Sequence, residues 1–166
     1  MLHVLFVCTG NTCRSPMAKA IYAEKSVEYG ISSICSSAAL GFGEGVVSPN
    51  SVEVCREIGI DISDHRPRVI RERDIAITDV FVVMTEMHAQ TLMGMLGVPM
   101  SKIYILGGGI PDPYGSDLET YRECRKKIEK GVDDFCKILK GMITNKSLKA
   151  GNDDQPYFNA NAVWTP

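Results

Sequence analysis

Cys8 and Arg14 are the two residues of this sequence with the clearest capacity for chemistry. Cys8 ends an apolar run near the N-terminus, a short loop of small and polar residues follows it, and Arg14 then precedes Ser-Pro. A loop between a strand and a helix turns its amide groups inward, in front of the positive end of the helix dipole. A guanidinium beside such a loop can clamp two oxygens of an oxyanion. The stretch therefore predicts a binding site for a phosphate-like anion.

The same surroundings would make Cys8 a nucleophile, because nearby positive charge favours the thiolate form of a cysteine. A thiolate beneath a bound phosphate attacks the phosphorus and forms a cysteinyl-phosphate intermediate. Ser15 is placed to donate a hydrogen bond to the sulfur when it leaves. Gly10 and Asn11 are residue types that tolerate the left-handed backbone of a tight loop. The residues expected to bind the phosphate are Thr9, Gly10, Asn11, Thr12, Cys13 and Arg14.

Two other interpretations of this loop are weaker. In the first, Cys8 is a buried core residue and Arg14 a surface charge. The coincidence of a thiol, a short loop, an arginine, a hydroxyl and a helix-starting proline just after a strand favours catalysis instead. The second, a nucleotide-binding loop, requires a Gly-Lys-Ser/Thr ending that this stretch lacks.

The elements that must position the loop alternate along the chain, which is typical of a parallel sheet covered by helices. Strands are expected at Leu2–Val7, Ile31–Ser36, Val80–Met84 and Lys102–Leu106. Helices are expected at Pro16–Tyr29, Ser48–Gly59, Glu86–Leu96 and Leu118–Leu139. We therefore predict a three-layer α/β fold, with a four-stranded parallel sheet, helices on both faces and the phosphate loop after the first strand.

Composition narrows the class of protein. The chain has 166 residues, of which 45% are hydrophobic and 23% charged, values that suit a soluble globular protein. A formal charge of −2 argues against a nucleic-acid or anionic-membrane partner. No apolar run reaches the roughly 18 residues that a membrane span needs, and the N-terminus lacks the pattern of a signal peptide. The six cysteines are too scattered for a disulfide framework, which indicates a reducing compartment.

These features lead to expectations about location, partners and cofactors. We expect a cytoplasmic protein, most simply a monomer, that binds neither nucleic acid nor a membrane. No cofactor is expected, and no cluster of His and Cys has the spacing of metal ligands. Residues 1–144 should form the catalytic domain, and the polar, aperiodic residues 145–166 a tail outside the fold.

The pattern Cys-x5-Arg-Ser-Pro resembles the low-molecular-weight protein tyrosine phosphatase family, and so do SSAA, GIDISDHRPR and PDPYG. The likeness extends to about residue 140, and CTGNTCRSPMA is most similar to the bacterial protein arginine phosphatases. The resemblance implies a cysteine-dependent phosphatase that acts on phosphorylated proteins. Its general acid, which protonates the leaving group, would be Asp112, with Asp117 the weaker candidate. It also implies that Asn11, Ser37 and His65 brace the phosphate loop.

Two further features have both a functional and a structural interpretation. Cys13 follows Cys8 closely, so a reversible disulfide between them could switch the enzyme off under oxidation, although simple packing in the loop would explain Cys13 as well. A basic cluster further along is expected to be a solvated face, with docking of acidic protein substrates as the weaker alternative; its members are Arg66, Arg68, Arg71 and Arg73.

The residues expected to set specificity are Thr12, Phe42 and Tyr114. Tyrosine-directed relatives have a large aliphatic residue in place of Thr12, and two aromatic residues in a row after the aspartate. Here Tyr114 is followed by glycine, so one wall for a phenyl ring is missing. A polar wall suits a guanidinium better than an aryl ring. We therefore predict that the protein hydrolyses phosphoarginine in proteins.

Three alternatives to this function stay open. The main one is a low-molecular-weight protein tyrosine phosphatase. A thioredoxin-coupled arsenate reductase is less favoured, because the segment after the third strand lacks the extra cysteines of that branch. A non-catalytic phosphate-binding module is disfavoured by the joint presence of Cys8, Arg14 and Asp112.

Overall fold

A four-stranded parallel sheet forms the centre of the computed structural model, which describes residues 1–149, with side chains described to residue 145. The strands lie in the order β2-β1-β3-β4. Their bounds are β1 (Leu2–Cys8), β2 (Ser33–Ala39), β3 (Val80–Val83) and β4 (Ile103–Ile105). The predicted fold class is confirmed.

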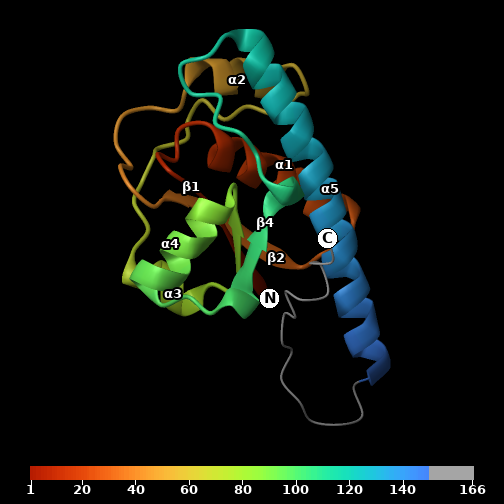
Figure 1. Ribbon diagram of the computed structural model, residues 1–166. Coiled ribbons are helices and arrows are strands. Elements are labelled where there is room, and N and C mark those ends of the chain that lie inside the picture. Colours follow the sequence, from red (N-terminus) through yellow and green to blue (C-terminus); the bar gives the residue numbers. More distant parts are fainter. Residues whose placement is uncertain (150–166) are drawn as a thin grey trace.

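Helices cover both faces of this sheet (Figure 1). On one face, α1 (Arg14–Glu28) packs against the long α5 (Leu118–Lys149), and α2 (Pro49–Arg56) contacts the first half of α5. On the other face lie α3 (Glu72–Ile77) and α4 (Glu86–Leu96). Among the described residues, no helix combines the length and the apolar character that a membrane crossing requires.

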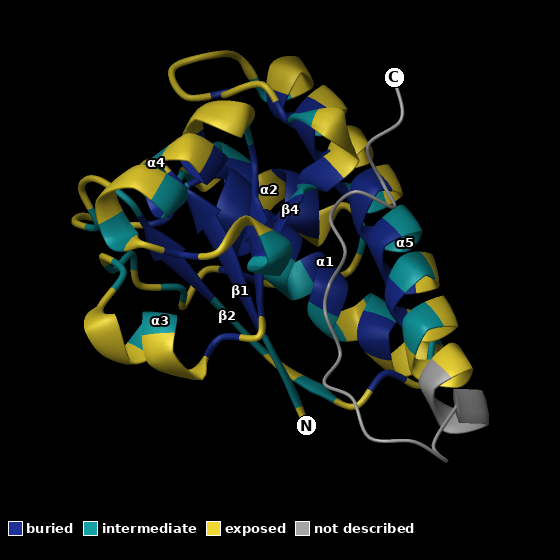
Figure 2. Ribbon diagram, turned by 60° about the horizontal axis from the view of Figure 1, so that its bottom comes forward, coloured by how far each residue is buried: buried dark blue, intermediate teal, exposed yellow. Residues whose placement is uncertain are grey.

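Strand β1 contributes side chains to the core on both faces of the sheet. Val4 and Phe6 belong to the core cluster with α1 and α5, whereas Leu5 and Val7 belong to the cluster on the α4 side. Burial on both faces is the reason that the strand is a continuous apolar run rather than an alternating one. Figure 2 shows the centre of the sheet in the colour of buried residues, surrounded by helices that are exposed outward, whereas the start of β2 is partly exposed. The end of β1 is thereby held rigidly in the core.

Most expected boundaries differ from the observed ones by one to three residues, and those of β2 and α5 are the most informative. Strand β2 begins at Ser33 rather than Ile31, because the Ile31 N–H bonds to the Ser26 carbonyl in the turn after α1. Helix α5 continues to Lys149, ten residues beyond the expected Leu139. Residues 145–149 of the predicted tail are therefore helical, and residues 150–166 lie outside the described residues, so the domain bounds stay a prediction.

Helix α3 was not expected from the sequence. None of its six residues is buried, so it has no apolar period that could reveal it. It is held at its start by Asp74, whose carboxylate accepts the Arg71 N–H at 2.8 Å and pairs with the Arg68 guanidinium at 2.7 Å.

Candidate active site

Cys8 is the last residue of β1 and Arg14 the first of α1, so the residues between them form a loop at the carboxyl edge of the sheet. We call it the Cys8–Arg14 loop. The Cys8 Sγ lies 3.0 Å from the Ser15 Oγ and accepts the Asn11 N–H at 3.3 Å. Both groups can stabilise negative charge on the sulfur. The expected contact between Cys8 and Ser15 is present.

Asn11 shapes this loop from within. Its φ of 56° is the only positive φ at a non-glycine among the described residues, and its side chain is completely buried. The Nδ2 donates to the Ser15 Oγ at 2.8 Å and the Ser37 Oγ at 3.0 Å. The Asn11 carbonyl accepts a hydrogen bond from the His65 Nε2 at 2.9 Å. The three expected brace residues thus lie together, and the Arg68 N–H joins them by donating to the Asn11 Oδ1 at 3.1 Å.

Burial lowers the pKa of His65, which keeps its imidazole neutral and suited to a single hydrogen bond with the loop. Of the two residues expected to permit a left-handed loop, only Asn11 takes a positive φ. Gly10 has none, but a Cβ there would lie 3.6 Å from the Phe42 carbonyl. That is an ordinary van der Waals distance, so neither backbone strain nor lack of space requires glycine at this position.

Arg14 lies beneath the loop with only 3% of its surface exposed. The Nη1 donates to the Ile110 carbonyl at 3.0 Å, and the Nη2 lies 3.1 Å from the Asp112 Oδ2. The Nε is buried and has no hydrogen-bond partner among the described residues. A buried cation with a free donor suits an oxyanion. Asp112 faces the same guanidinium with a half-exposed side chain, where it can pass a proton to or from a ligand.

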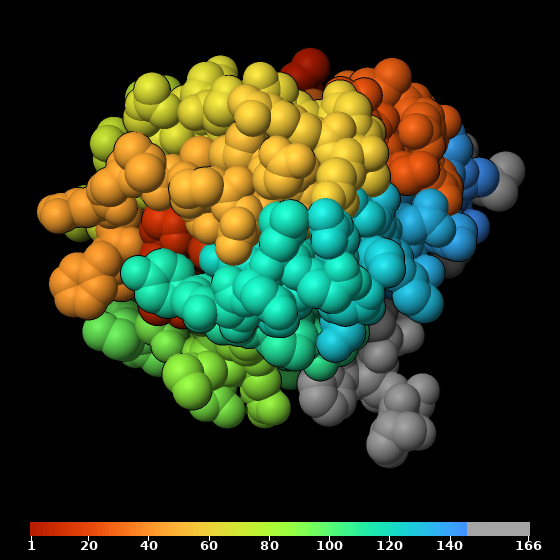
Figure 3. All heavy atoms as spheres, turned by 90° about the horizontal axis from the view of Figure 1, so that it is seen from above, coloured from red at the N-terminus to blue at the C-terminus, as the bar shows by residue number. Residues whose placement is uncertain are grey.

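A cavity of about 330 Å³ opens above these groups. Figure 3 looks onto it: red atoms from the start of the chain lie in a hollow between an orange segment and a teal segment. The predicted wall residues Thr12, Phe42 and Tyr114 all line it. The complete lining is Cys8, Thr9, Gly10, Thr12, Cys13, Arg14, Phe42, Glu44, Asp112 and Tyr114.

Asp117 does not line this cavity. Its carboxylate accepts the Thr120 N–H at 2.9 Å and the Thr120 hydroxyl at 2.6 Å, at the start of α5. These hydrogen bonds lower the pKa of Asp117 and identify it as a helix-capping residue. Of the two aspartates, Asp112 is the one that lines the cavity and faces Arg14, so its role as general acid stays a prediction.

Three residues at the site were missed. Glu44 adds a second carboxylate to the cavity wall. The His88 Nε2 lies 2.9 Å from the Thr9 Oγ1 behind the loop, and burial lowers the pKa of His88 to about 4. Tyr121, on α5, lies 3.3 Å from the Cys13 Sγ and accepts the Ser48 hydroxyl at 3.1 Å. His88 follows the third strand, so its position at the carboxyl edge of the sheet was a usable signal.

Three of the other cysteines, Cys55, Cys124 and Cys136, are buried in the core. Burial raises the pKa of Cys55 and of Cys124 to about 12 and that of Cys136 to about 11, so these thiols stay protonated. Cys13, the residue before α1, lines the cavity together with Cys8.

Comparison with known proteins places these features in context. Residues 3–145 match the model of the family described as low molecular weight phosphotyrosine protein phosphatase. The chain is 29% identical to a protein-arginine-phosphatase of Bacillus subtilis, over 84% of this chain and 97% of the relative. It is 35% identical to the low molecular weight protein-tyrosine-phosphatase PtpB of Staphylococcus haemolyticus, over 76% and 92%. The solved structure of YwlE arginine phosphatase from Geobacillus stearothermophilus superimposes with a TM-score of 0.78 at 28% identity, covering 93% of this chain and all of that one.

Proposed function

The chain belongs to the low molecular weight phosphotyrosine protein phosphatase family, and from this premise we propose that it hydrolyses phosphoarginine in proteins. Membership makes it a cysteine-nucleophile hydrolase of phosphorylated protein substrates. The phosphatases that it is similar to are named for two substrate classes, protein phosphoarginine and protein phosphotyrosine. The choice between them depends on the walls of the cavity.

In the proposed reaction, the phosphate oxygens bind the amides of the Cys8–Arg14 loop and the guanidinium of Arg14. The Cys8 thiolate attacks phosphorus, the P–N bond breaks, and the electron pair of that bond goes to the guanidine nitrogen. Asp112 donates the proton that this nitrogen takes up. The products of this step are arginine and a cysteinyl phosphate.

The second step releases inorganic phosphate. The Asp112 carboxylate, now deprotonated, accepts a proton from water as the water oxygen attacks phosphorus. The P–S bond breaks and the sulfur leaves as a thiolate, with a hydrogen bond from the Ser15 hydroxyl stabilising its charge. Asn11, Ser37 and His65 act as positioning residues, since they hold the loop open for both steps.

The observation that carries the arginine assignment is Glu44, a second carboxylate in the cavity wall beside the general acid Asp112. Asp112 and Glu44 both line the space above the phosphate loop, and Thr12 adds a hydroxyl rather than an aliphatic chain. Carboxylates bind a guanidinium through charge-assisted hydrogen bonds, whereas a phenyl ring would gain nothing from them. Arginine is also the poorer leaving group, because its pKa exceeds about 12 against about 10 for a phenol. Protonation of the leaving group by Asp112 should therefore contribute more to the rate with phosphoarginine than with phosphotyrosine.

Steady-state kinetics on matched phosphoarginine and phosphotyrosine peptides test this assignment. We expect a higher kcat/KM for phosphoarginine, and we expect Thr12→Ile to shift the preference toward phosphotyrosine. Glu44→Gln should raise KM for phosphoarginine and leave KM for phosphotyrosine unchanged. A preference of the unmodified protein for phosphotyrosine would refute the assignment.

The proposal also concerns the location of the enzyme, its oligomeric state and its regulation by oxidation. We propose that the enzyme works as a cytoplasmic monomer and that oxidation joins Cys8 and Cys13 in a reversible disulfide. The reaction consumes a peroxide, which oxidises Cys8 to a sulfenic acid; the Cys13 thiol then displaces water. Peroxide followed by dithiothreitol should restore activity in the unmodified protein and not in Cys13→Ser. Equal recovery of both would rule out the switch.

A further inference from the structure

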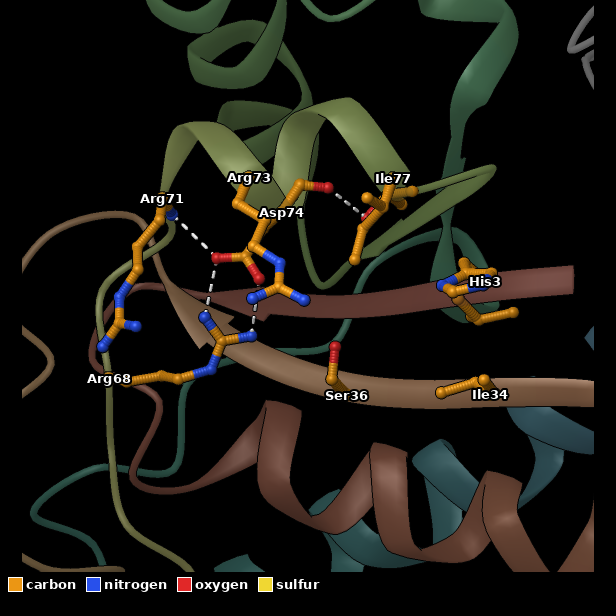
Figure 4. A pocket seen from close by; sticks show the side chains of 10 residues that line it. His3, Ile34, Ser36, Arg68, Arg71, Arg73, Asp74 and Ile77 are labelled. Carbon is orange, nitrogen blue, oxygen red and sulfur yellow. Dashed lines mark hydrogen bonds and ion pairs between the residues drawn. The ribbon is translucent and has the colours of Figure 1, made fainter.

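A second cavity, of about 310 Å³, lies under α3 on the face of the sheet opposite α1 and α5 (Figure 4). It shares no lining residue with the active site. Its floor is formed by β1 and β2, and its roof by α3 and the segment that precedes this helix. The complete lining is His3, Val4, Ile34, Ser36, Arg68, Arg71, Arg73, Asp74, Ile77 and Thr78.

Positive charge exceeds negative charge in this cavity. Asp74 is the one acidic residue of the lining, and it is already occupied: its two oxygens bind the Arg68 guanidinium at 2.7 and 3.0 Å. Arg71 and Arg73 form no ion pair within the part of the chain that the structure describes. Figure 4 shows the Arg73 side chain between α3 and the strands, beside the Arg68–Asp74 pair. Two guanidinium groups are thus free for an external anion.

The cavity also presents aliphatic surface. Ile34 is 50% exposed and Ile77 is 47% exposed. They stay uncovered because α3 is short and buries none of its residues. A bare inorganic anion would pair with the arginines and leave this surface in water. A peptide with acidic and aliphatic side chains would cover both, which is the arrangement found in protein interfaces.

Arg68 connects this cavity to the active site. Its side chain lines the second cavity, and its backbone N–H donates to the Asn11 Oδ1 in the Cys8–Arg14 loop at 3.1 Å. A protein bound under α3 would therefore contact Arg68, a residue that also hydrogen-bonds to Asn11 in the catalytic loop.

We propose that the cavity under α3 is a docking site for an acidic, aliphatic segment of a protein substrate. The proposal rests on the proposed function only in calling the partner a substrate. The occupant is recognised by carboxylates that pair with Arg71 and Arg73 and by aliphatic side chains that pack on Ile34 and Ile77.

Binding of an unphosphorylated peptide tests the site without relying on catalysis. A fluorescent peptide of alternating Glu and Leu is titrated with the protein, and its anisotropy is compared with that of a peptide in which Gln replaces Glu. The test variant is Arg71→Ala with Arg73→Ala. The matched control is Lys126→Ala with Lys130→Ala, which removes two exposed cations from α5.

We expect the test variant to bind the Glu peptide about fivefold more weakly, the effect that two exposed ion pairs typically supply, and the control to bind it like the unmodified protein. Turnover of p-nitrophenyl phosphate should be unchanged in both variants. On a phosphorylated protein with an acidic segment, the test variant should show a raised KM at constant kcat.

Equal binding by the two variants, or equal binding of the Glu and Gln peptides, would overturn the proposal. Displacement of the peptide by low concentrations of inorganic phosphate alone would overturn the peptide as occupant and indicate a small-anion site. If peptide binding depends on Arg71 and Arg73 but phosphoarginine is not hydrolysed, the proposed function fails while the docking site stands.

Discussion

Replacement of Asn11 offers the sharpest test of how the catalytic loop is held. This residue is the only non-glycine with a positive φ among the described residues, and it is completely buried. Asn11→Gly removes the side chain and keeps a residue that adopts a φ of 56° without strain. Asn11→Ala removes the same hydrogen bonds but keeps the Cβ, which disfavours this backbone once the polar side-chain group is gone.

The size of the effect follows from the contacts. The Asn11 side chain donates two hydrogen bonds and accepts one, at 2.8, 3.0 and 3.1 Å. Three hydrogen bonds at about 0.5–1.5 kcal/mol each predict that Asn11→Gly loses about 1.5–4.5 kcal/mol of unfolding free energy. Asn11→Ala should be less stable still, by about 1 kcal/mol. Both variants should also lose kcat, because Ser15 and the loop are no longer fixed around Cys8.

Urea unfolding followed by circular dichroism gives the stabilities, and p-nitrophenyl phosphate gives kcat. Asn50→Ala is the matched control, since its one side-chain hydrogen bond, to the Ser116 carbonyl, is exposed and long at 3.4 Å. It should stay within about 0.5 kcal/mol of the unmodified protein. The reasoning is refuted if Asn11→Gly is equally close to the unmodified protein and keeps its kcat.

Two further predictions concern the residues around the site. His88 titrates at 6.5 when exposed, and burial lowers its pKa to about 4 in the folded protein. Protonation therefore favours unfolding, and the stability that neutral His88 provides is lost as the pH falls from 6.5 toward 4, by about 3 kcal/mol. Urea unfolding from pH 7 to pH 4 should show a shallower loss for His88→Gln; parallel profiles would contradict the burial argument. A Cβ on Gly43 would clash with the Arg68 carbonyl carbon, so Gly43→Ala should cost about 1–3 kcal/mol and raise KM by displacing the wall residues beside it. Gly94→Ala, which meets open space in α4, is the control and should stabilise the protein by about 0.5–1 kcal/mol.

The sequence was sufficient for those parts of the fold whose burial leaves a periodic trace. Strand β1 is buried on both faces and α5 carries a long apolar stripe, so both were predicted, although the end of α5 was not. Helix α3 left no such trace, because it is held by the Arg68–Asp74 pair rather than by buried side chains. In the sequence, the two residues of such an ion pair cannot be distinguished from other charged residues that are exposed to solvent.

The active site also has parts that the sequence predicts and parts that it does not. The Cys8–Arg14 loop is contiguous, so its chemistry could be derived from the residues themselves. Contacts across the edge of the sheet could not be derived from the sequence, because they depend on which strands are neighbours. Tyr121 lies 108 positions from Cys13, and His88 lies 79 positions from Thr9, yet each forms a hydrogen bond with the loop. The place of Asp112 opposite Arg14 was expected because the leaving group needs an acid, which the loop after the last strand supplies, and because the family resemblance implies it.

Trapping the covalent intermediate tests the central claim most directly. The protein is mixed with a phosphoarginine peptide, quenched within a turnover, digested and analysed by mass spectrometry. We predict phosphate on the sulfur of the peptide that contains Cys8, and neither label nor turnover in Cys8→Ala. Undiminished turnover in Cys8→Ala, or phosphate on any other residue, would contradict the account.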